Sequence, residues 1–299
     1  MTKKLLLTGA YSYSKEQLDK IEQLGWNITF VQNELEALDI DVREFDAVVC
    51  NNLFLYNNIK KFENLKIIQL TSAGTEKLPM DYVHKQKIEV FNAKGVYSIP
   101  MAEWAIMNIL QLYKNAPGFY EKQKKRLWEK DRSLMELDGK NVVIIGYGDV
   151  GKEIAKRLKS FGVTIIALNR SKVKDANIDQ WVPLGKIDSI LGKAEIVIVS
   201  LALTKETYHL IKQRQFYLMK KDSILVNLSR GDIICENDLI NVLEHGWFRG
   251  VALDVFSQEP LNSQSPLWNY DRVIITPHNS FVSDRIKERL FTVIINNLK

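Results

Sequence analysis

Residues 140–171 constrain the fold more strongly than any other stretch of the chain. An apolar, β-branched run at 142–145 leads into the glycine-rich segment 146–151, GYGDVG, after which apolar residues recur at helical spacing up to Leu158. A second apolar run follows at 163–168. This change of period predicts a strand, a tight turn, a helix and a second strand, which together form one βαβ unit.

The glycines of this turn have separate physical roles. We expect Gly146 to allow the tight turn, Gly148 to let the backbone approach a phosphate without an intervening Cβ atom, and Gly151 to let the helix pack close to the strand. A pyrophosphate would then lie at the positive end of the helix, near the amides of Asp149 and Val150. The context predicts a dinucleotide site, although glycine-rich turns also occur for purely structural reasons.

The size and charge of the chain exclude some classes of partner. Its 299 residues, 46% of them hydrophobic, are enough for one large or two ordinary domains with buried cores. The net charge of +5 arises from 41 basic and 36 acidic residues that are interspersed along the chain. We therefore expect no nucleic-acid partner, whereas an anionic small molecule fits this charge.

Cysteine usage and hydropathy exclude further classes. Cys50 and Cys235 lie far apart, which predicts neither a disulfide framework nor a metal site and fits a reducing compartment, the cytoplasm. The first residues, MTKKLLLTGAYS, have an apolar core that is too short for a signal peptide and fit a first strand better. No apolar run approaches the ~20 residues that a membrane helix needs, so we expect no membrane partner.

The first hundred residues alternate short apolar runs with amphipathic segments, which predicts a parallel α/β domain. Strands are expected at 5–7, 28–31, 47–50 and 66–70, and a helix capped by Ser14 is expected to run to about Leu24. Open α/β sheets bind ligands at the loops after their strands. The loops 51–54 and 71–75 are therefore candidates, although the second also fits an ordinary turn.

The pattern changes at Pro100, where a long amphipathic helix is predicted at 100–115. The segment 118–133 that follows is dense in charge, and Trp128 is isolated among its lysines. A solvated arm explains this segment, and so does an arm whose aromatic side chain is buried against a partner subunit.

Beyond Ser171 the alternation of strands and helices continues a doubly wound sheet. Strands are expected at 196–200, 224–227, 250–253 and 273–276, and helices at 212–219 and 236–245. Each strand ends in polar residues, which should converge on one cleft. The last stretch, 283–299, is predicted to be an amphipathic helix that returns to pack on the first domain.

Three side chains at these strand ends suit the reduction of a carbonyl group. Hydride transfer needs a nicotinamide, a proton donor for the developing alkoxide and a cation that holds the substrate. Arg230 could bind a carboxylate with both guanidinium nitrogens. His278 could donate the proton, and Glu259 could fix its tautomer and keep it protonated. Taken alone, such a histidine more often has a structural role.

Four motifs in order resemble the D-isomer-specific 2-hydroxyacid dehydrogenase family. They are GYGDVG at 146–151, NLSRG at 227–231, VALDVF at 251–256 with Glu259 and Pro260, and TPH at 276–278. Segments 72–74 and 92–97 extend the resemblance into the first domain. It implies two Rossmann-like domains with doubly wound parallel sheets. A dinucleotide domain, 100–279, is inserted into a flavodoxin-like substrate domain, 1–99 plus 280–299, and the enzyme is usually a homodimer through the dinucleotide domain.

Carried over by position, the resemblance makes His278 the general acid/base, Glu259 its partner and Arg230 the clamp for a small 2-oxo or 2-hydroxy acid. The amides of Ala73 and Gly74 fall on the loop that binds the substrate carboxylate. The positions that line the cofactor are Leu201, Ala202, Thr207, Leu228, Ser229 and Asp254, together with Arg230 and His278. Ala202 departs from the proline of many relatives.

A second departure concerns the choice of cofactor. Relatives that prefer NAD carry an acidic residue at the end of the second strand of the unit, where this chain has Asn169, Arg170 and Ser171. Because an arginine with a neighbouring hydroxyl would bind a 2′-phosphate, we expect a preference for NADP(H), with NAD possible. A solvated surface cation is the alternative explanation of Arg170.

Two other functions fit the same motifs. The chain ends about 20 residues after His278, which leaves no room for an appended regulatory domain and favours at most a short form of phosphoglycerate dehydrogenase. Some relatives of this fold act instead as dinucleotide sensors or corepressors with little turnover. Which 2-oxo acid is reduced cannot be read from the motifs.

Overall fold

The computed structural model describes residues 3–299, so the first two residues of the expected first domain lie outside it. The chain forms two compact units, residues 1–97 with 283–299 and residues 98–282. The expected boundaries were at 99/100 and 279/280. The second unit thus starts two residues earlier and ends three residues later than the motifs indicated.

The first unit is built on a five-stranded parallel sheet with the strand order β2-β1-β3-β4-β5. Its strands are β1 (Lys3–Thr8), β2 (Trp26–Val31), β3 (Ala47–Cys50), β4 (Ile67–Leu70) and β5 (Glu89–Phe91). This is the flavodoxin-like order, in which the connection reverses direction between β1 and β3. The loops after these two strands therefore diverge at the carboxyl edge of the sheet.

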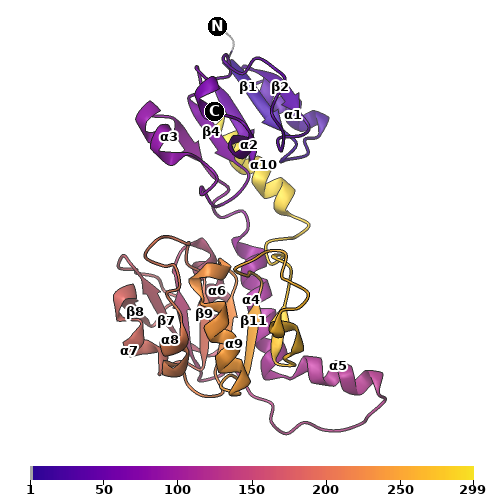
Figure 1. The fold of residues 1–299 in the computed structure, drawn as a ribbon, viewed down its shortest axis with the longest axis vertical. Helices are drawn as coiled ribbons and strands as arrows, with labels where there is room; N and C mark the ends of the chain where they lie inside the picture. The colour runs from indigo at the N-terminus through magenta and orange to yellow at the C-terminus, as the bar shows by residue number, and fades with distance from the viewer. Residues whose placement is uncertain (1–2) are drawn as a thin grey trace. The chain divides into compact units, whose positions relative to one another are not determined.

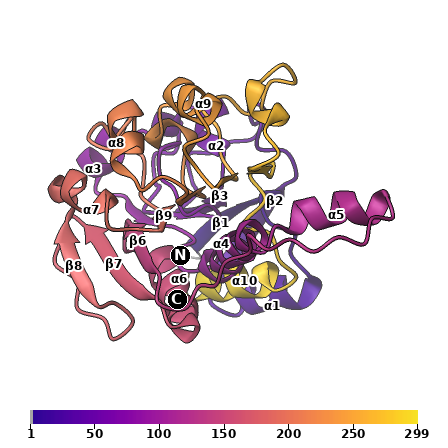
Figure 2. The ribbon, with the colours of Figure 1, turned by 90° about the horizontal axis from the view of Figure 1, so that it is seen from below.

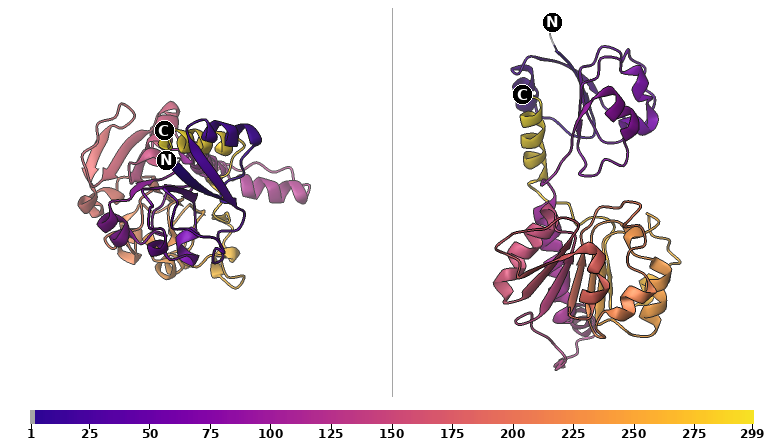
Figure 3. Two further views of the ribbon diagram at one scale, coloured as in Figure 1. Left: turned by 90° about the horizontal axis from the view of Figure 1, so that it is seen from above. Right: turned by 90° about the vertical axis from the view of Figure 1, so that its left-hand side faces the viewer.

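Helices cover both faces of this sheet (Figure 3). One face carries α1 (Lys15–Glu22) and α10 (Ile286–Asn297), and the other carries α2 (Leu53–Tyr56), the 3-10 turn η1 (Ile59–Lys61) and α3 (Met80–Gln86). Ser14 caps α1 as expected, because its Oγ accepts a hydrogen bond of 3.2 Å from the amide of Gln17.

The C-terminal helix packs back on the first unit, which confirms that prediction. Leu290, Ile294 and Leu298 lie in one core with side chains of β1 and β3, and the indole nitrogen of Trp26 donates a 2.9 Å hydrogen bond to the carbonyl of Leu298. The two ends of the chain therefore share one hydrophobic core, which makes the second unit an insertion between them.

The second unit is built on a seven-stranded parallel sheet with the order β12-β11-β10-β9-β6-β7-β8 (Figure 1). Its strands are β6 (Asn141–Ile145), β7 (Thr164–Asn169), β8 (Gln180–Pro183), β9 (Ile196–Val199), β10 (Ile224–Asn227), β11 (Gly250–Leu253) and β12 (Val273–Ile275). The order contains the dinucleotide-binding arrangement, whose direction changes between β6 and β9. The expected doubly wound parallel sheet is present in each unit.

Both faces of this second sheet are buried. Val142 and Ile144 point to one face, and Val143 and Ile145 point to the other, because successive strand residues alternate. The first face is covered by α4 (Ser98–Tyr113) and α6 (Asp149–Leu158), the second by α7 (Asp188–Leu191), α8 (Gln213–Leu218) and α9 (Glu236–Glu244). Short 3-10 turns lie at Lys159–Phe161, Leu184–Lys186, Gly231–Ile233 and Pro266–Asn269.

The segment after α4 differs from the simple arm that its composition indicated. It contains a helix, α5 (Ala116–Lys124), which extends away from the sheet of its unit (Figure 2). The charge density of this segment hid the helix, because it shows no apolar stripe. Trp128 is fully exposed, so its indole is not buried within the described chain. The helix α4 also begins at Ser98, before Pro100, since the first helical amides need no intrahelical acceptor.

The sequence did not predict five short strands and helices, β5, β8, α2, α3 and α7, and α2 begins within the segment 51–54 that was expected to be a loop. Each is too short for its period to be recognised without the strands beside it. In the part of the chain that the structure describes, no helix combines the length and the apolar character that crossing a membrane requires.

Glu195, which directly precedes β9, links this strand to β6 at the amino edge of the second sheet. Its carboxylate accepts a hydrogen bond of 2.8 Å from the amide of Asn141 and one from the ammonium of Lys220. Burial raises the pKa of Glu195, but these hydrogen bonds outweigh burial and hold the pKa below its ordinary value of 4.5.

We expect Glu195→Gln to lower the free energy of unfolding by about 1 kcal/mol at pH 7, because a charge-assisted hydrogen bond is lost. A carboxylate whose pKa is lower in the folded protein than in the unfolded chain stabilises the fold at pH values above its unfolded-state pKa. This stabilisation is lost as the pH falls through the folded-state pKa. The difference in the free energy of unfolding between wild type and variant, measured by urea unfolding, should therefore decrease below pH 4.5. Glu22→Gln, at an exposed site, is the control, and a pH-independent difference would contradict this origin.

Candidate functional site

The glycine-rich turn after β6 has the geometry that its sequence indicated. Gly146 has φ +98°, and a Cβ atom there would lie 2.8 Å from the amide nitrogen of Leu201. A Cβ atom on Gly151 would lie 2.4 Å from the carbonyl oxygen of Gly146. Both positions therefore require glycine. Gly146 needs it because of its positive φ, and Gly151 needs it because α6 approaches β6 closely there.

Gly148 differs from these two glycines, because a Cβ atom there would meet no atom within 4 Å. It stands at the start of the ten-residue helix α6, where no side chain caps the first amides. The first amides of a helix lack intrahelical acceptors and carry its positive dipole end. The open space over Gly148, with the amides of Asp149 and Val150 beside it, fits a pyrophosphate group.

The end of β7 carries no acidic residue. Asn169 Oδ1 accepts a long, 3.5 Å hydrogen bond from the amide of Tyr147, and its Nδ2 donates a 3.2 Å hydrogen bond to the carbonyl of Ser171. Arg170 and Ser171 are exposed. The Thr204 hydroxyl lowers the pKa of Glu206 most, and the charge of Arg170 contributes, so Arg170 lies near the loop after β9.

The loop after β9 lies beside the glycine turn, because Ser200 Oγ donates a 2.7 Å hydrogen bond to the carbonyl of Gly146. Leu201 is half-buried and Ala202 is exposed. Thr207 is buried, and its hydroxyl donates to the carbonyl of Ala202 at 2.8 Å and accepts from the amide of Thr204 at 2.7 Å. The Thr207 hydroxyl thus determines the shape of this loop.

Arg230, Asp254 and His278 follow β10, β11 and β12, which are neighbours in the sheet. Since all three strands are parallel, their ends gather the three residues at the carboxyl edge. Asn227 shapes the first of these turns: its Oδ1 accepts from the hydroxyl of Ser229 at 2.8 Å and its Nδ2 donates to the carbonyl of Arg230 at 3.1 Å. Leu228 and Ser229 are buried, and Arg230 Nη1 donates to the carbonyl of Ser229 at 2.8 Å.

Asp254 is fully buried, and its carboxylate holds the segment that carries the histidine. It accepts hydrogen bonds from Thr276 Oγ1 at 2.5 Å, from the amide of Asn279 at 2.8 Å and from the amide of Ser280 at 2.9 Å. The amide of His278 donates to the carbonyl of Asp254 at 2.8 Å. Because a buried carboxylate is costly unless it is hydrogen-bonded, this network makes the turn around His278 rigid.

His278 and Glu259 form the pair that the sequence indicated. The distance between His278 Nδ1 and Glu259 Oε2 is 2.8 Å, and Glu259 Oε1 accepts from the amide of Phe256 at 3.1 Å. Since an ionised carboxylate only accepts hydrogen bonds, Nδ1 carries the proton and Nε2 is the atom that can exchange one with a ligand. His278 has φ +50°, a strained conformation that the Asp254 network maintains.

The loop after β4 in the first unit has occupied carbonyls and open amides. The carbonyls of residues 71–74 accept, in order, from Tyr97 Oη, from the amide of Ala93, from Asn92 Nδ2 at 2.7 Å and from Ser72 Oγ at 2.9 Å. Among residues 3–299, the amides of Ala73 and Gly74 donate no hydrogen bond, and the carboxylate of Glu76 lies beside Gly74. Such neighbouring free amides suit a carboxylate.

The structure thus gathers most of the expected site residues in the second unit, while Ala73 and Gly74 belong to the first. Motif reading missed the residues that support them. These are Asn227, Thr276, Asn279 and Ser280. Asn227 and Thr276 stand within quoted motifs, and Asn279 and Ser280 directly follow one, but only the hydrogen bonds reveal their supporting role.

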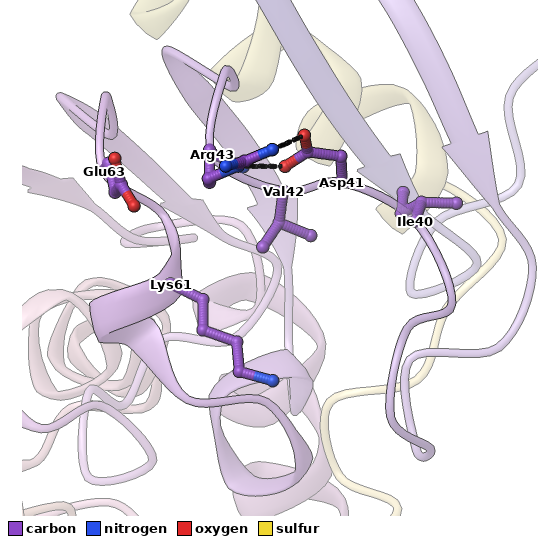
Figure 4. A pocket seen from close by; sticks show the side chains of 6 residues that line it. All are labelled: Ile40, Asp41, Val42, Arg43, Lys61 and Glu63. Carbon is purple, nitrogen blue, oxygen red and sulfur yellow. Dashed lines mark hydrogen bonds and ion pairs between the residues drawn. The ribbon is translucent and has the colours of Figure 1, made fainter.

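A hollow of about 230 Å³ lies elsewhere, lined by Ile40, Asp41, Val42, Arg43, Lys61 and Glu63 (Figure 4). It is next to the segment that enters β3 at its amino end, so it is remote from the carboxyl edge. Arg43 points at Asp41 there, with Nη2 2.6 Å from Oδ2, and the two charges compensate each other. None of the candidate site residues lines this hollow.

Comparison with known proteins identifies relatives of the chain. The family model for the D-isomer specific 2-hydroxyacid dehydrogenase, NAD binding domain, matches residues 106–280, more than half of the chain. A glyoxylate reductase from Thermofilum pendens is 31% identical over 273 residues, which are 88% of this chain and 80% of that protein. A D-3-phosphoglycerate dehydrogenase from Methanocaldococcus jannaschii is 32% identical over 81% of this chain, but the match covers 46% of that protein.

A solved structure agrees in fold. The glyoxylate reductase from Paecilomyes thermophila superimposes with a TM-score of 0.85 at 23% identity, over 99% of this chain and 94% of that one. At this identity the likeness concerns the fold. The matched residues 106–280 include the glycine turn and the strand ends that carry Arg230, Glu259 and His278.

Asp254→Ala should lower the free energy of unfolding by about 3 kcal/mol or more, because three donors lose their acceptor in a buried place. Thr276→Val is the matched variant: it removes one of these donors, and about 1 kcal/mol is expected. Urea unfolding of both variants measures the difference. Equal stability of the two would mean that Asp254 does not hold the turn.

Proposed function

Because the chain belongs to the D-isomer specific 2-hydroxyacid dehydrogenase family, we propose that it reduces a small 2-oxo acid to a D-2-hydroxy acid with His278 as the general acid/base. The observation that carries this assignment is the 2.8 Å contact between His278 Nδ1 and Glu259 Oε2 at a rigid strand end. It leaves Nε2 as the proton donor. The glyoxylate reductase relative supports a small 2-oxo acid as the substrate.

Each group of residues has a separate role in the proposed reaction. A bound nicotinamide dinucleotide supplies the hydride, and the glycine turn, the Asn169–Ser171 segment, the loop after β9 and Asp254 are proposed to hold it. His278 Nε2 gives its proton to the carbonyl oxygen that becomes the hydroxyl, and Glu259 stabilises the ring while it is charged. Arg230 clamps the substrate carboxylate, since a guanidinium binds it with two nitrogens.

We assign the first unit as the substrate domain and the second as the dinucleotide domain. The free amides of Ala73 and Gly74 support the first assignment, because they offer a second hold on the carboxylate. The glycine turn at the β6/β9 switch point supports the other. Closure of two such domains would exclude water from the transfer.

The proposed enzyme is a cytoplasmic homodimer that associates through the dinucleotide domain. Cys50 and Cys235 are both free thiols, which fits a reducing compartment. Trp128 is fully exposed and Leu127 and Tyr120 are about half exposed on and beside α5. Exposed aromatic and apolar side chains of this kind fit burial against a second copy.

His278→Asn tests the general acid/base, because asparagine tolerates the positive φ and cannot exchange the proton. We expect kcat to fall about 10²- to 10⁴-fold, with cofactor affinity largely kept. Absorbance at 340 nm with NADPH and a panel of 2-oxo acids measures turnover, and His84→Ala at an exposed site is the control. Near-wild-type kcat would refute the role of His278.

A wild type that binds cofactor tightly but consumes none with any acid would instead be a dinucleotide sensor.

The preferred cofactor is proposed to be NADPH. No acidic side chain follows β7, and Arg170 and Ser171 are exposed where a 2′-phosphate would approach. A positive charge and a hydroxyl at this place favour the phosphorylated ribose.

Asn169→Asp together with Arg170→Ala should reverse this preference. The variant gains an acceptor for ribose hydroxyls and loses the phosphate contact, so kcat/KM with NADPH should fall at least about 10-fold relative to NADH. Arg157→Ala, on α6 and paired with Glu153, is a control for loss of an arginine elsewhere in the unit. A wild type that clearly prefers NADH would contradict the assignment.

A further inference from the structure

Lys77 lies where the loops after β3 and β4 meet at the carboxyl edge of the first sheet. Its ammonium nitrogen is 3.3 Å from Oδ1 of Asn51, the residue that follows β3, and its side chain is half-buried. Across residues 3–299 no carboxylate lies within ion-pair distance of Lys77. Lys77 therefore brings a positive charge without a carboxylate partner to this edge of the sheet.

The topology puts this lysine beside the switch point of the first sheet. Strand β1 has β2 on one side and β3 on the other, so the loops after β1 and β3 leave in opposite directions. Ligands of open α/β sheets bind in the crevice that such loops create. Asn51 lines this crevice, because it follows β3 directly.

A buried carboxylate fixes the backbone that carries Asn51. Glu34 is only 5% exposed, and its oxygens accept from Thr8 Oγ1 at 2.6 Å, from the amide of Asn52 at 2.6 Å and from the amide of Asn51 at 3.1 Å. These contacts use its acceptors within the protein. Asn51 is therefore held rigidly, and it holds the ammonium of Lys77 in turn.

The acidic residue next to Lys77 in the chain is Glu76. A Cβ atom on Gly74 would lie 2.0 Å from Glu76 Oε2, so the carboxylate of Glu76 lies against the loop at Gly74. The amide nitrogen Nδ2 of Asn51 has no acceptor among the described residues. Lys77 and Asn51 thus offer an ammonium and an N–H group side by side, a few residues from the free amides of Ala73 and Gly74.

We propose that Lys77 and Asn51 recognise a second carboxylate, at the far end of the 2-oxo acid substrate. This inference rests on the proposed function and specifies its substrate class as 2-oxo diacids. One ammonium and one amide N–H match the two oxygens of a carboxylate, whereas a phosphate group offers more oxygens than these donors satisfy. The hydrogen bonds of Glu34 to the amides of Asn51 and Asn52 fix the backbone of this loop, so little backbone entropy is lost on binding.

The experiment compares Lys77→Met, Lys77→Arg and the control Lys61→Met, which removes the same charge from the amino side of the same unit. Oxaloacetate and 2-oxoglutarate supply the second carboxylate, while pyruvate and hydroxypyruvate lack it. In Lys77→Met, kcat/KM for the diacids should fall about 10- to 100-fold, mainly through KM, with little change for the monoacids. Lys77→Arg should keep most of the selectivity and Lys61→Met all of it.

Two results would overturn the proposal: an equal loss for both classes of acid, which indicates a structural role, or a wild type that prefers monoacids or phosphohydroxypyruvate. A binding assay separates this failure from failure of the proposed function. We expect D-malate to raise the melting temperature of the cofactor-saturated wild type more than D-lactate, and Lys77→Met to lose this difference. If the wild type shows the difference but turns over no 2-oxo acid, the catalytic proposal fails and the carboxylate site stands.

Discussion

Parallel pairing of every strand within each sheet is the constraint on which the rest of the structure depends. Parallel strands all end at one edge, and each must return through a crossover that covers a face of the sheet. The faces are therefore apolar and buried, and polar residues are left to the carboxyl edge. Residues as distant in the chain as Gly146, Arg230 and His278 reach that edge of the second sheet for this reason alone.

Buried carboxylates then make these edges rigid. The carboxylates of Asp254 in the second unit and of Glu34 in the first accept hydrogen bonds from backbone amides and from a threonine hydroxyl at a strand end. Asp254 fixes the turn around His278, and Glu34 fixes the backbone at Asn51; both of these residues belong to sites that we propose. A buried charge that is fully hydrogen-bonded contributes order where the chain would otherwise form a mobile loop.

This order bears on function, because hydride transfer demands that donors stand where charge develops. In the proposed reaction, the contact of His278 Nδ1 with Glu259 leaves Nε2 for the proton transfer, and the Asp254 network maintains the strained, positive φ of His278. In the first unit all four carbonyls of the loop at 71–74 accept hydrogen bonds, whereas the amides of Ala73 and Gly74 donate none, and our proposal assigns these two amides to the substrate carboxylate. Membership of the 2-hydroxyacid dehydrogenase family gives these separate features a common chemistry.

The sequence was sufficient to predict the elements that have a local pattern. These are the βαβ unit around Gly148, the apolar strands and the motifs that carry Arg230 and His278. Their signals are periodicity and spacing, which need no partner. Tertiary structure alone decided β8, which depends on pairing with β7, and the helix α5, whose charged surface hides its period. It also decided the contacts between polar residues far apart in the chain, such as Glu34 with Asn52, because a hydrogen bond depends on proximity that the fold creates.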